Sequence, residues 1–456
     1  MKSKIHIFCP EYVPLKNKGE EAIIRGVADV LFPEGNCDIH ILDIEADEYT
    51  YHDGIHVYPS KWFISSWMNG EFGLGLSWEK TRGSAQSLLR NGLHKLWPSW
   101  VKIKCAPLNM TASQMKNLAS GRPPVDEKER RLSQLLACDY IVAGHDGGLN
   151  ERVCHIIDIM RDFGIPCGIF GLELSAPFKS RAIAEIHHDT LRHCHFFYCR
   201  TLATVQNIKS YFPEIQAELL PDPAFGMQPA QDDIIDNIIN DEGLTSFFNK
   251  KVVMCTCCEP APIARYCFEN IKQPGAKLDA HRQLFAELIQ YIVKNYNVNV
   301  LFLPHAMGPG KALDDRLIAN DILKRANLPS ERARLLTTEC SARILKSFLK
   351  KAELLVAERI HSLIGATGVH TPFLCMGSNT DKRIHGIIIN MLGMENEVYF
   401  LNRPSLTELK VKFNDIWERR AELKKHLIDK ATKNKTDLDE AANIMRKLIE
   451  DHNKRR

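Results

Sequence analysis

An arginine and a histidine stand two residues apart in Glu358-Arg359-Ile360-His361, directly after the apolar run 354–357. An arginine can hold a phosphate or a carboxylate through two parallel hydrogen bonds. A histidine, with an ordinary pKa of about 6.5, can donate or accept a proton at neutral pH. The pattern therefore indicates anion binding beside acid–base catalysis, although a helix-capping arginine next to a structural histidine would produce the same residues.

The elements that must position this pair follow from the hydrophobic pattern around it. Residues 354–357 are typical of a short buried strand, and the small residues from Ser362 to Thr367 favour a closely packed helix. In a parallel sheet such a turn lies at the carboxyl end of the strand, where ligands bind, and the first amides of the helix can help to hold an anion. We therefore expect Arg359 and His361 to face one ligand site.

Four motifs, in order along the chain, resemble the polysaccharide pyruvyl transferase family. They are Asn17-Lys18-Gly19-Glu20-Glu21-Ala22, then Asp222-Pro223-Ala224-Phe225, then Leu303-Pro304-His305 with Asp314-Asp315, and finally the Arg359–His361 turn with Thr371-Pro372 and Lys382. Together these motifs span most of the chain.

The resemblance implies an α/β protein with two Rossmann-like domains facing a cleft, as in the glycosyltransferase-B fold. It implies transfer of an enolpyruvyl-derived group from phosphoenolpyruvate to two hydroxyls of a saccharide or lipid-linked saccharide, forming a cyclic ketal and releasing phosphate. Catalysis is then expected from His361 and Arg359. The residues expected to bind the donor are Arg200, Arg359, Lys382 and His305, and those expected on the acceptor side are Asn17, Gly19, Gly147, Gly148 and Asp222. We expect no metal and no cofactor.

Two segments depart from the family pattern. Where the family commonly shows Arg-Asp-x-x-Ser, this chain has the segment 200–204, Arg-Thr-Leu-Ala-Thr, so only Arg200 carries over. The glycine turn at 144–148 reads Gly-His-Asp-Gly-Gly and is looser than a compact triple-glycine turn. Two other interpretations therefore stay open, a glycosyltransferase of the same plan that uses a sugar nucleotide and a catalytically silent binding or assembly protein.

Three cysteines lie close together in Cys255-Thr256-Cys257-Cys258. A structural zinc site usually takes four ligands from two separated pairs, and the chain has no second Cys-x-x-Cys. A nucleophilic thiol would need a base positioned beside it. We interpret the cysteines as small residues that line the ligand site, with metal binding and nucleophilic catalysis as the alternatives.

Short apolar runs alternate with amphipathic stretches along most of the 456 residues, which indicates doubly wound parallel sheets. We expect an N-terminal Rossmann-like domain over 1–228, a linker over 229–250 and a C-terminal Rossmann-like domain over 251–403. The helical tail over 404–456 is most simply a pair of helices. An insert at about 60–125 interrupts the first domain.

The insert is rich in tryptophan and positive charge. Between Lys61 and Lys104 lie five of the six tryptophans, with seven Lys or Arg against two Glu. These residues form either a buried aromatic cluster or a basic surface for a lipid-linked acceptor, with peripheral membrane contact. The net charge of the whole chain, +3, argues against nucleic acid as a partner. We find no export signal and no apolar run of transmembrane length, so we expect a cytoplasmic protein.

Overall fold

The structure, a computed structural model, describes residues 4–62, 106–145, 149–174, 178, 181–308 and 310–453. Most of the tryptophan-rich segment, including four of its five tryptophans, lies outside these residues, and so do Gly147 and Gly148. The chain divides into two compact units. The first takes Met1–Val13, Leu31–Leu220 and Ala441–Arg456, and the second takes Pro14–Val30 and Pro221–Glu440. The domain boundaries expected at 228, 250 and 403 stay predictions.

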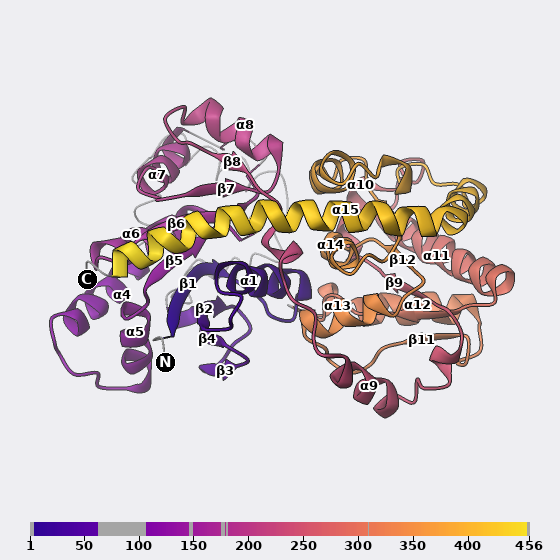
Figure 1. Cartoon of the computed structure of the whole chain (residues 1–456), viewed down its shortest axis with the longest axis horizontal. Coiled ribbons are helices and arrows are strands. Elements are labelled where there is room, and N and C mark those ends of the chain that lie inside the picture. Colours follow the sequence, from indigo (N-terminus) through magenta and orange to yellow (C-terminus); the bar gives the residue numbers. More distant parts are fainter. Residues whose placement is uncertain are drawn as a thin grey trace. The chain divides into compact units, whose positions relative to one another are not determined.

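The first unit is built on an eight-stranded sheet with the order β3-β4-β2-β1-β5-β6-β7-β8 (Figure 1). All neighbouring strands are parallel except the pair β3 and β4. The strands are β1 (Ile5–Tyr12), β2 (Cys37–Asp43), β3 (Thr50–His52), β4 (Ile55–Pro59), β5 (Tyr140–Ala143), β6 (Cys167–Leu172), β7 (Phe197–Cys199) and β8 (Glu218–Leu219). The α-helices within this unit are α4 (Ala106–Ala119), α5 (Glu127–Leu136), α6 (Glu151–Asp162), α7 (Arg181–Leu191) and α8 (Leu202–Tyr211).

The second unit is built on a parallel six-stranded sheet with the order β11-β10-β9-β12-β13-β14. Its strands are β9 (Val252–Thr256), β10 (Asn299–Phe302), β11 (Ala333–Leu335), β12 (Leu354–Ala357), β13 (Phe373–Gly377) and β14 (Val398–Phe400). Its helices include α1 (Lys18–Leu31, with Leu31 in the first unit), α9 (Asp232–Asp241), α10 (Pro260–Tyr266), α11 (Pro274–Tyr296), α12 (Asp315–Ala326), α13 (Ala342–Lys350), α14 (Ile360–Gly368) and a π-helix (Ile384–Met391). Every residue of β9 and β12 is buried, as expected for central parallel strands covered on both faces.

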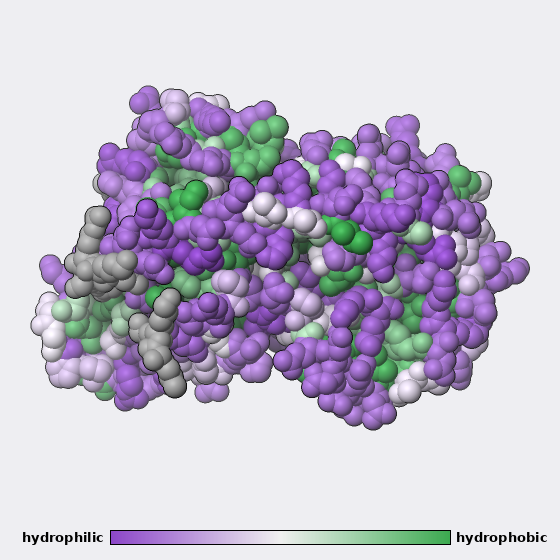
Figure 2. Space-filling model, in the orientation of Figure 1, coloured by the Kyte–Doolittle hydropathy of each residue, from purple (hydrophilic) through white to green (hydrophobic). Residues whose placement is uncertain are grey.

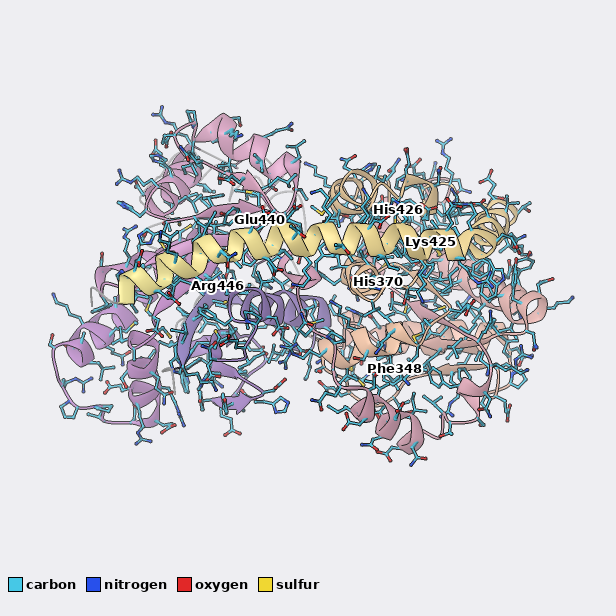
Figure 3. The ribbon with its side chains drawn as sticks, in the orientation of Figure 1. Phe348, His370, Lys425, His426, Glu440 and Arg446 are labelled. Atoms are coloured by element: carbon cyan, nitrogen blue, oxygen red, sulfur yellow. The ribbon has the colours of Figure 1, made fainter. Side chains whose placement is uncertain are left out.

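The C-terminal tail is a single helix, α15 (Leu406–Asn453), so the expectation of two helices is wrong. The segment contains no glycine or proline that would end a helix. Its residues up to Glu440 belong to the second unit and those from Ala441 to the first. Within the second unit, the His426 ring bonds the carbonyl of Leu392 at 2.7 Å (Figure 3).

Hydrophilic residues predominate over the face of the molecule seen in Figure 2, including the visible side of α15. Over the described part of the chain, we find no helix whose length and apolar character would suit a membrane span.

Helix α1 packs against the short 3₁₀ turn Pro223–Phe225 through a glycine. A Cβ added at Gly26 would lie 2.1 Å from the carbonyl oxygen of Pro223 and 2.8 Å from the amide of Ala224. Both neighbours are backbone atoms, which cannot rotate out of the way. Gly26 therefore fixes how closely α1 approaches the Asp222–Phe225 segment.

We expect Gly26→Ala to lower the free energy of unfolding by at least about 2 kcal/mol, because the added methyl group must push two backbone segments apart. Gly275→Ala is the matched control, since a Cβ there meets nothing within 4 Å. Its stability should stay unchanged or rise by up to about 1 kcal/mol. Urea unfolding of both variants tests this, and equal stability of the two would contradict the packing argument.

Candidate active site

The site lies where the second sheet reverses its strand order, between the adjacent strands β9 and β12. Ligands of open parallel sheets bind at such a point, beyond the carboxyl ends of the strands. The backbone amide of Glu358 donates to the carbonyl of Thr256 at 3.1 Å, and the amide of Cys258 donates to the Glu358 carboxylate at 3.0 Å. These bonds fasten the turn that carries Arg359 to the end of β9.

Arg359 is held on several sides within this turn. Its guanidinium makes ion pairs with Asp315 and Glu259, and its Nε donates to the carbonyl of Cys257 at 3.2 Å. The side chain is 15% exposed. Burial alone would lower the pKa of Arg359, but the two carboxylates outweigh burial and raise it. Arg359 is therefore a fixed cation with a known orientation.

Asp315 connects the Arg359 turn to the loop that follows β10. Its Oδ2 accepts from the amides of His305 and Ala306 at 3.0 and 2.9 Å, while its Oδ1 pairs with Arg359. The Pro-His and Asp-Asp elements of the sequence thus form one connected unit with the arginine. The expected donor residues His305 and Arg359 are brought together by this carboxylate.

His361 is the second residue of α14, and its ring faces a buried carboxylate. Its Nε2 is 3.7 Å from Oδ2 of Asp222, whose side chain is fully buried. The other oxygen of Asp222 accepts from the amide of Ala224 at 2.9 Å and so caps the turn Pro223–Phe225. Asp222, which we expected on the acceptor side, therefore lies beside the expected catalytic histidine.

Gly19 and Asn17, also expected on the acceptor side, lie against the same histidine. A Cβ at Gly19 would be 2.4 Å from Nδ1 of His361, so only glycine leaves room for the ring. Asn17 accepts from the amide of Gly19 at 3.2 Å, and Asn17 pairs with Ala306 in an isolated β-bridge. The motif at the start of α1 thus closes around His361 and the loop after β10.

His305 is buried in this cluster and stays uncharged at neutral pH. Burial lowers its pKa to about 3, and the neighbouring side chains of His361, Arg359 and Lys18 act in the same direction. Its carbonyl accepts from the amide of Lys18 at 2.9 Å. The neutral ring of His305 can accept or donate a hydrogen bond without adding charge to the site.

The sequence did not predict a buried pair of side chains that holds Glu358, the residue directly before Arg359. His281, on α11, bonds Oε1 of Glu358 at 2.6 Å, and both side chains are almost fully buried. No spacing in the sequence connects them. Glu259, the second partner of Arg359, was also missed, although its place just after β9 could have indicated it.

The neighbouring cysteines do not have the properties of nucleophiles. Burial raises the pKa of Cys257 and of Cys258 well above the ordinary value, and the carboxylates around them add to this effect. A thiol needs a lowered pKa to be reactive at neutral pH. The structure therefore favours the interpretation of these residues as packing groups at the end of β9.

Two further expected donor residues are Lys382 and Arg200. Lys382 is exposed, in the loop between β13 and the π-helix. Arg200 belongs to the first unit, where it follows β7, is fully buried and lies 3.5 Å from Glu173. Arg359 belongs to the second unit, and the expected pairing of Arg200 with Arg359 stays a prediction.

The altered residues after Arg200 form a helix cap. Thr201 is the N-cap of α8, and its Oγ1 accepts from the amide of Thr204. The two hydroxyls also bond each other at 2.9 Å. Threonine at these positions therefore completes the start of α8.

A second buried carboxylate, Glu11, escaped the sequence reasoning. It lies in β1, beside the point where the first sheet reverses its strand order, and accepts from the amide of Gly144 after β5. Burial raises its pKa, which the nearby His145 partly offsets. A Glu within an apolar strand carried no motif that would have indicated it.

Comparison with known proteins identifies a family and a fold for this chain. A family model described as polysaccharide pyruvyl transferase matches residues 17–380, and no curated protein matches significantly. The chain is similar in structure to a trehalose-6-phosphate synthase, OtsA, with 10% identity, 98% of this chain and 99% of that chain covered, and a TM-score of 0.51. An E. coli ADP-heptose lps heptosyltransferase II matches with 11% identity over 92% and 99%, at a TM-score of 0.44. The first similarity confirms the expected fold class, with two Rossmann-like domains as in glycosyltransferase-B enzymes.

The low pKa of His305 predicts that acid destabilises this site. Below pH 6.5 the unfolded chain takes up a proton on His305 that the folded chain does not, so stability is lost as the pH falls from about 6.5 towards 3. At about pH 5.5 the loss amounts to about 1.4 kcal/mol relative to about pH 8. Between these two pH values, the free energy of unfolding of His305→Gln, measured with urea, should fall by about 1.4 kcal/mol less than that of the wild type. His385→Gln, which changes a more exposed histidine of the same unit, should behave as the wild type does. If His305→Gln kept the full acid sensitivity, His305 would not be the group responsible.

Proposed function

Because this chain belongs to the polysaccharide pyruvyl transferase family, a family of transferases, we propose that it moves an enolpyruvyl-derived group from phosphoenolpyruvate to two hydroxyls of a saccharide. The observation that carries this proposal is the arrangement of Arg359 and His361 at the strand-order reversal of the second sheet, with a buried carboxylate beside each side chain.

Arg359 suits the anionic donor because its orientation is set before the donor arrives. Among the residues that the structure describes, the contacts to Asp315, Glu259 and Cys257 use one N–H on each Nη and the Nε–H, which leaves a second N–H on each Nη for a phosphate or carboxylate of the donor. The two carboxylates more than offset the charge of the guanidinium, so a donor with two anionic groups needs further cations. We assign this role to Lys382 and Arg200, as the resemblance implies.

His361 suits acid–base catalysis because its imidazole is buried against Asp222. When a saccharide hydroxyl adds to C2 of the enol, the hydroxyl loses its proton and C3 gains one, which leaves a phosphorylated ketal intermediate. A second hydroxyl then forms its bond to C2 as the C2–O bond to phosphate breaks, and its proton passes to the departing phosphate, which gives the cyclic ketal and free phosphate. Asp222 stabilises the imidazolium that His361 becomes when it holds the transferred proton.

The product of this reaction is a saccharide with an added carboxylate. This chemistry suits the modification of envelope or secreted polysaccharides, before or after their attachment to a lipid carrier. The family and the fold support a saccharide acceptor and an activated donor, and the proposal adds phosphoenolpyruvate as that donor.

Donor preference tests the proposal directly. The full chain should unfold at a higher temperature with phosphoenolpyruvate present, because a ligand that binds only the folded state stabilises it. UDP and GDP should leave the melting temperature unchanged. Stabilisation by a nucleotide alone would point to a sugar-nucleotide glycosyltransferase, and no response to any of the three would point to a protein that binds without catalysis.

We expect Arg359→Lys to bind phosphoenolpyruvate about 10- to 100-fold more weakly, because lysine cannot reproduce the charge-assisted hydrogen bonds of the guanidinium. Isothermal titration calorimetry below the unfolding temperature measures this. Arg403→Lys, which changes an exposed arginine of the same unit, is the control and should bind as the wild type does. Equal affinities of the two variants would exclude Arg359 from the donor site.

We expect His361→Gln to lose about 10²- to 10⁴-fold in turnover while phosphoenolpyruvate affinity stays close to that of the wild type. Gly19→Ala should also lower turnover, because its methyl group would overlap the His361 ring. Phosphate release from phosphoenolpyruvate in the presence of a panel of saccharides measures turnover. Turnover retained in His361→Gln, with only the melting temperature lowered, would make His361 structural.

A further inference from the structure

Three histidines of the first unit lie together on one face of its sheet, on three neighbouring strands. His6 is on β1, His40 on β2 and His56 on β4, and His40 is directly opposite His56 in the strand register. Alternate residues of a strand share a face, so Asp38 and Tyr58 lie on the same side as the histidines. One potential ligand atom from each imidazole lies within 4.8 Å of the other two.

In two of the three imidazoles, Nδ1 lies within hydrogen-bond distance of a tyrosine hydroxyl. Nδ1 of His40 is 2.9 Å from the hydroxyl of Tyr58, and Nδ1 of His56 is 2.7 Å from the hydroxyl of Tyr49. The Tyr58 hydroxyl donates a hydrogen bond to Oε1 of Gln134 at 3.5 Å, so its oxygen can accept one from Nδ1 of His40. For His40, this outer contact fixes the ring and leaves Nε2 with its lone pair, as is common for histidine ligands of metals.

One of the inward nitrogens, on His56, lies close to a carboxylate. Nε2 of His40 is 3.0 Å from Nδ1 of His6, and Nε2 of His56 is 3.4 Å from Oδ2 of Asp38. Ligand atoms about 2.0–2.1 Å from a tetrahedral zinc ion are about 3.3 Å apart, which is close to these spacings. The rings of His40 and His56 are stacked, with centroids 4.2 Å apart and an interplanar angle of 2°, so one of them must rotate before both nitrogens point at the ion. Asp38 also pairs with Lys4 at 2.9 Å, but the Lys4 side chain is 45% exposed and can move into solvent.

We propose that His6, His40, His56 and Asp38 form a binding site for a divalent transition metal of the zinc class. Three imidazoles and a carboxylate are a ligand set that suits zinc and similar metals. The ion would link β1, β2 and β4 near their amino-terminal ends, whereas Glu11, Gly144 and Arg200 lie at or beyond the carboxyl ends of their strands. The site is therefore structural, and it does not depend on the proposed transferase activity.

The test uses the untagged full chain, freed of metal with a chelator and titrated with zinc chloride. We expect a single zinc ion per chain to remain after dialysis and a melting temperature that rises with zinc concentration. Cobalt(II) at the same site should give the strong visible absorption of a tetrahedral complex. No zinc retained by the wild type would overturn the proposal.

Single substitutions locate the ion. His56→Gln and His6→Gln change partly exposed ligands, and each should weaken zinc binding at least about 100-fold and abolish the tetrahedral cobalt spectrum. His52→Gln changes an exposed histidine on β3 and should bind zinc as the wild type does. Circular dichroism of the metal-free variants checks that each is folded. If both ligand variants bound zinc as tightly as His52→Gln does, the ion would lie elsewhere and the assignment would be wrong.

Discussion

The ion pair between Arg359 and Asp315 is the constraint on which the rest of the site depends. Both side chains are largely removed from water, and the loss of one partner from such a pair leaves a buried charge that costs about 3–5 kcal/mol. The pair therefore holds the turn after β12 against the loop after β10. Because Asp315 also binds the amides of His305 and Ala306, the same carboxylate sets the backbone on which the start of α1 docks.

The position of His361 follows from this framework and not from its own turn alone. The ring fits because Gly19 has no side chain, and its Nε2 faces Asp222 because Asp222 caps the turn Pro223–Phe225. Gly26 brings α1 close to that same turn. Three segments that are far apart in sequence thus determine the position of the His361 imidazole. A substitution on α1 can therefore lower catalysis without changing a residue that contacts the substrate.

The alternation of apolar runs and amphipathic stretches was enough to predict two parallel sheets, and the Arg-x-His turn was correctly predicted to follow a buried strand. What could not be predicted are contacts that span hundreds of residues. Gly19 and Asp222 carry no local sign that they meet His361, and His281 has no spacing that relates it to Glu358. The expectation of two helices in the C-terminal tail was wrong because an apolar stripe indicates the helical period but not where a helix ends. The absence of glycine and proline over 406–453 indicates one continuous helix.

The same reasoning bears on the residues that depart from the family pattern. Thr201 and Thr204 replace the common aspartate and serine, and this difference supported the interpretation of the chain as catalytically silent. In the structure Thr201 is the N-cap of α8, and its hydroxyl accepts a hydrogen bond from the backbone amide of Thr204. Asp, Ser and Thr all satisfy the free amides at a helix start, so the exchange preserves the same local physics. A motif residue can therefore be replaced without a change of function when its role is to cap a helix. The difference at 201–204 is no argument against catalysis by this chain.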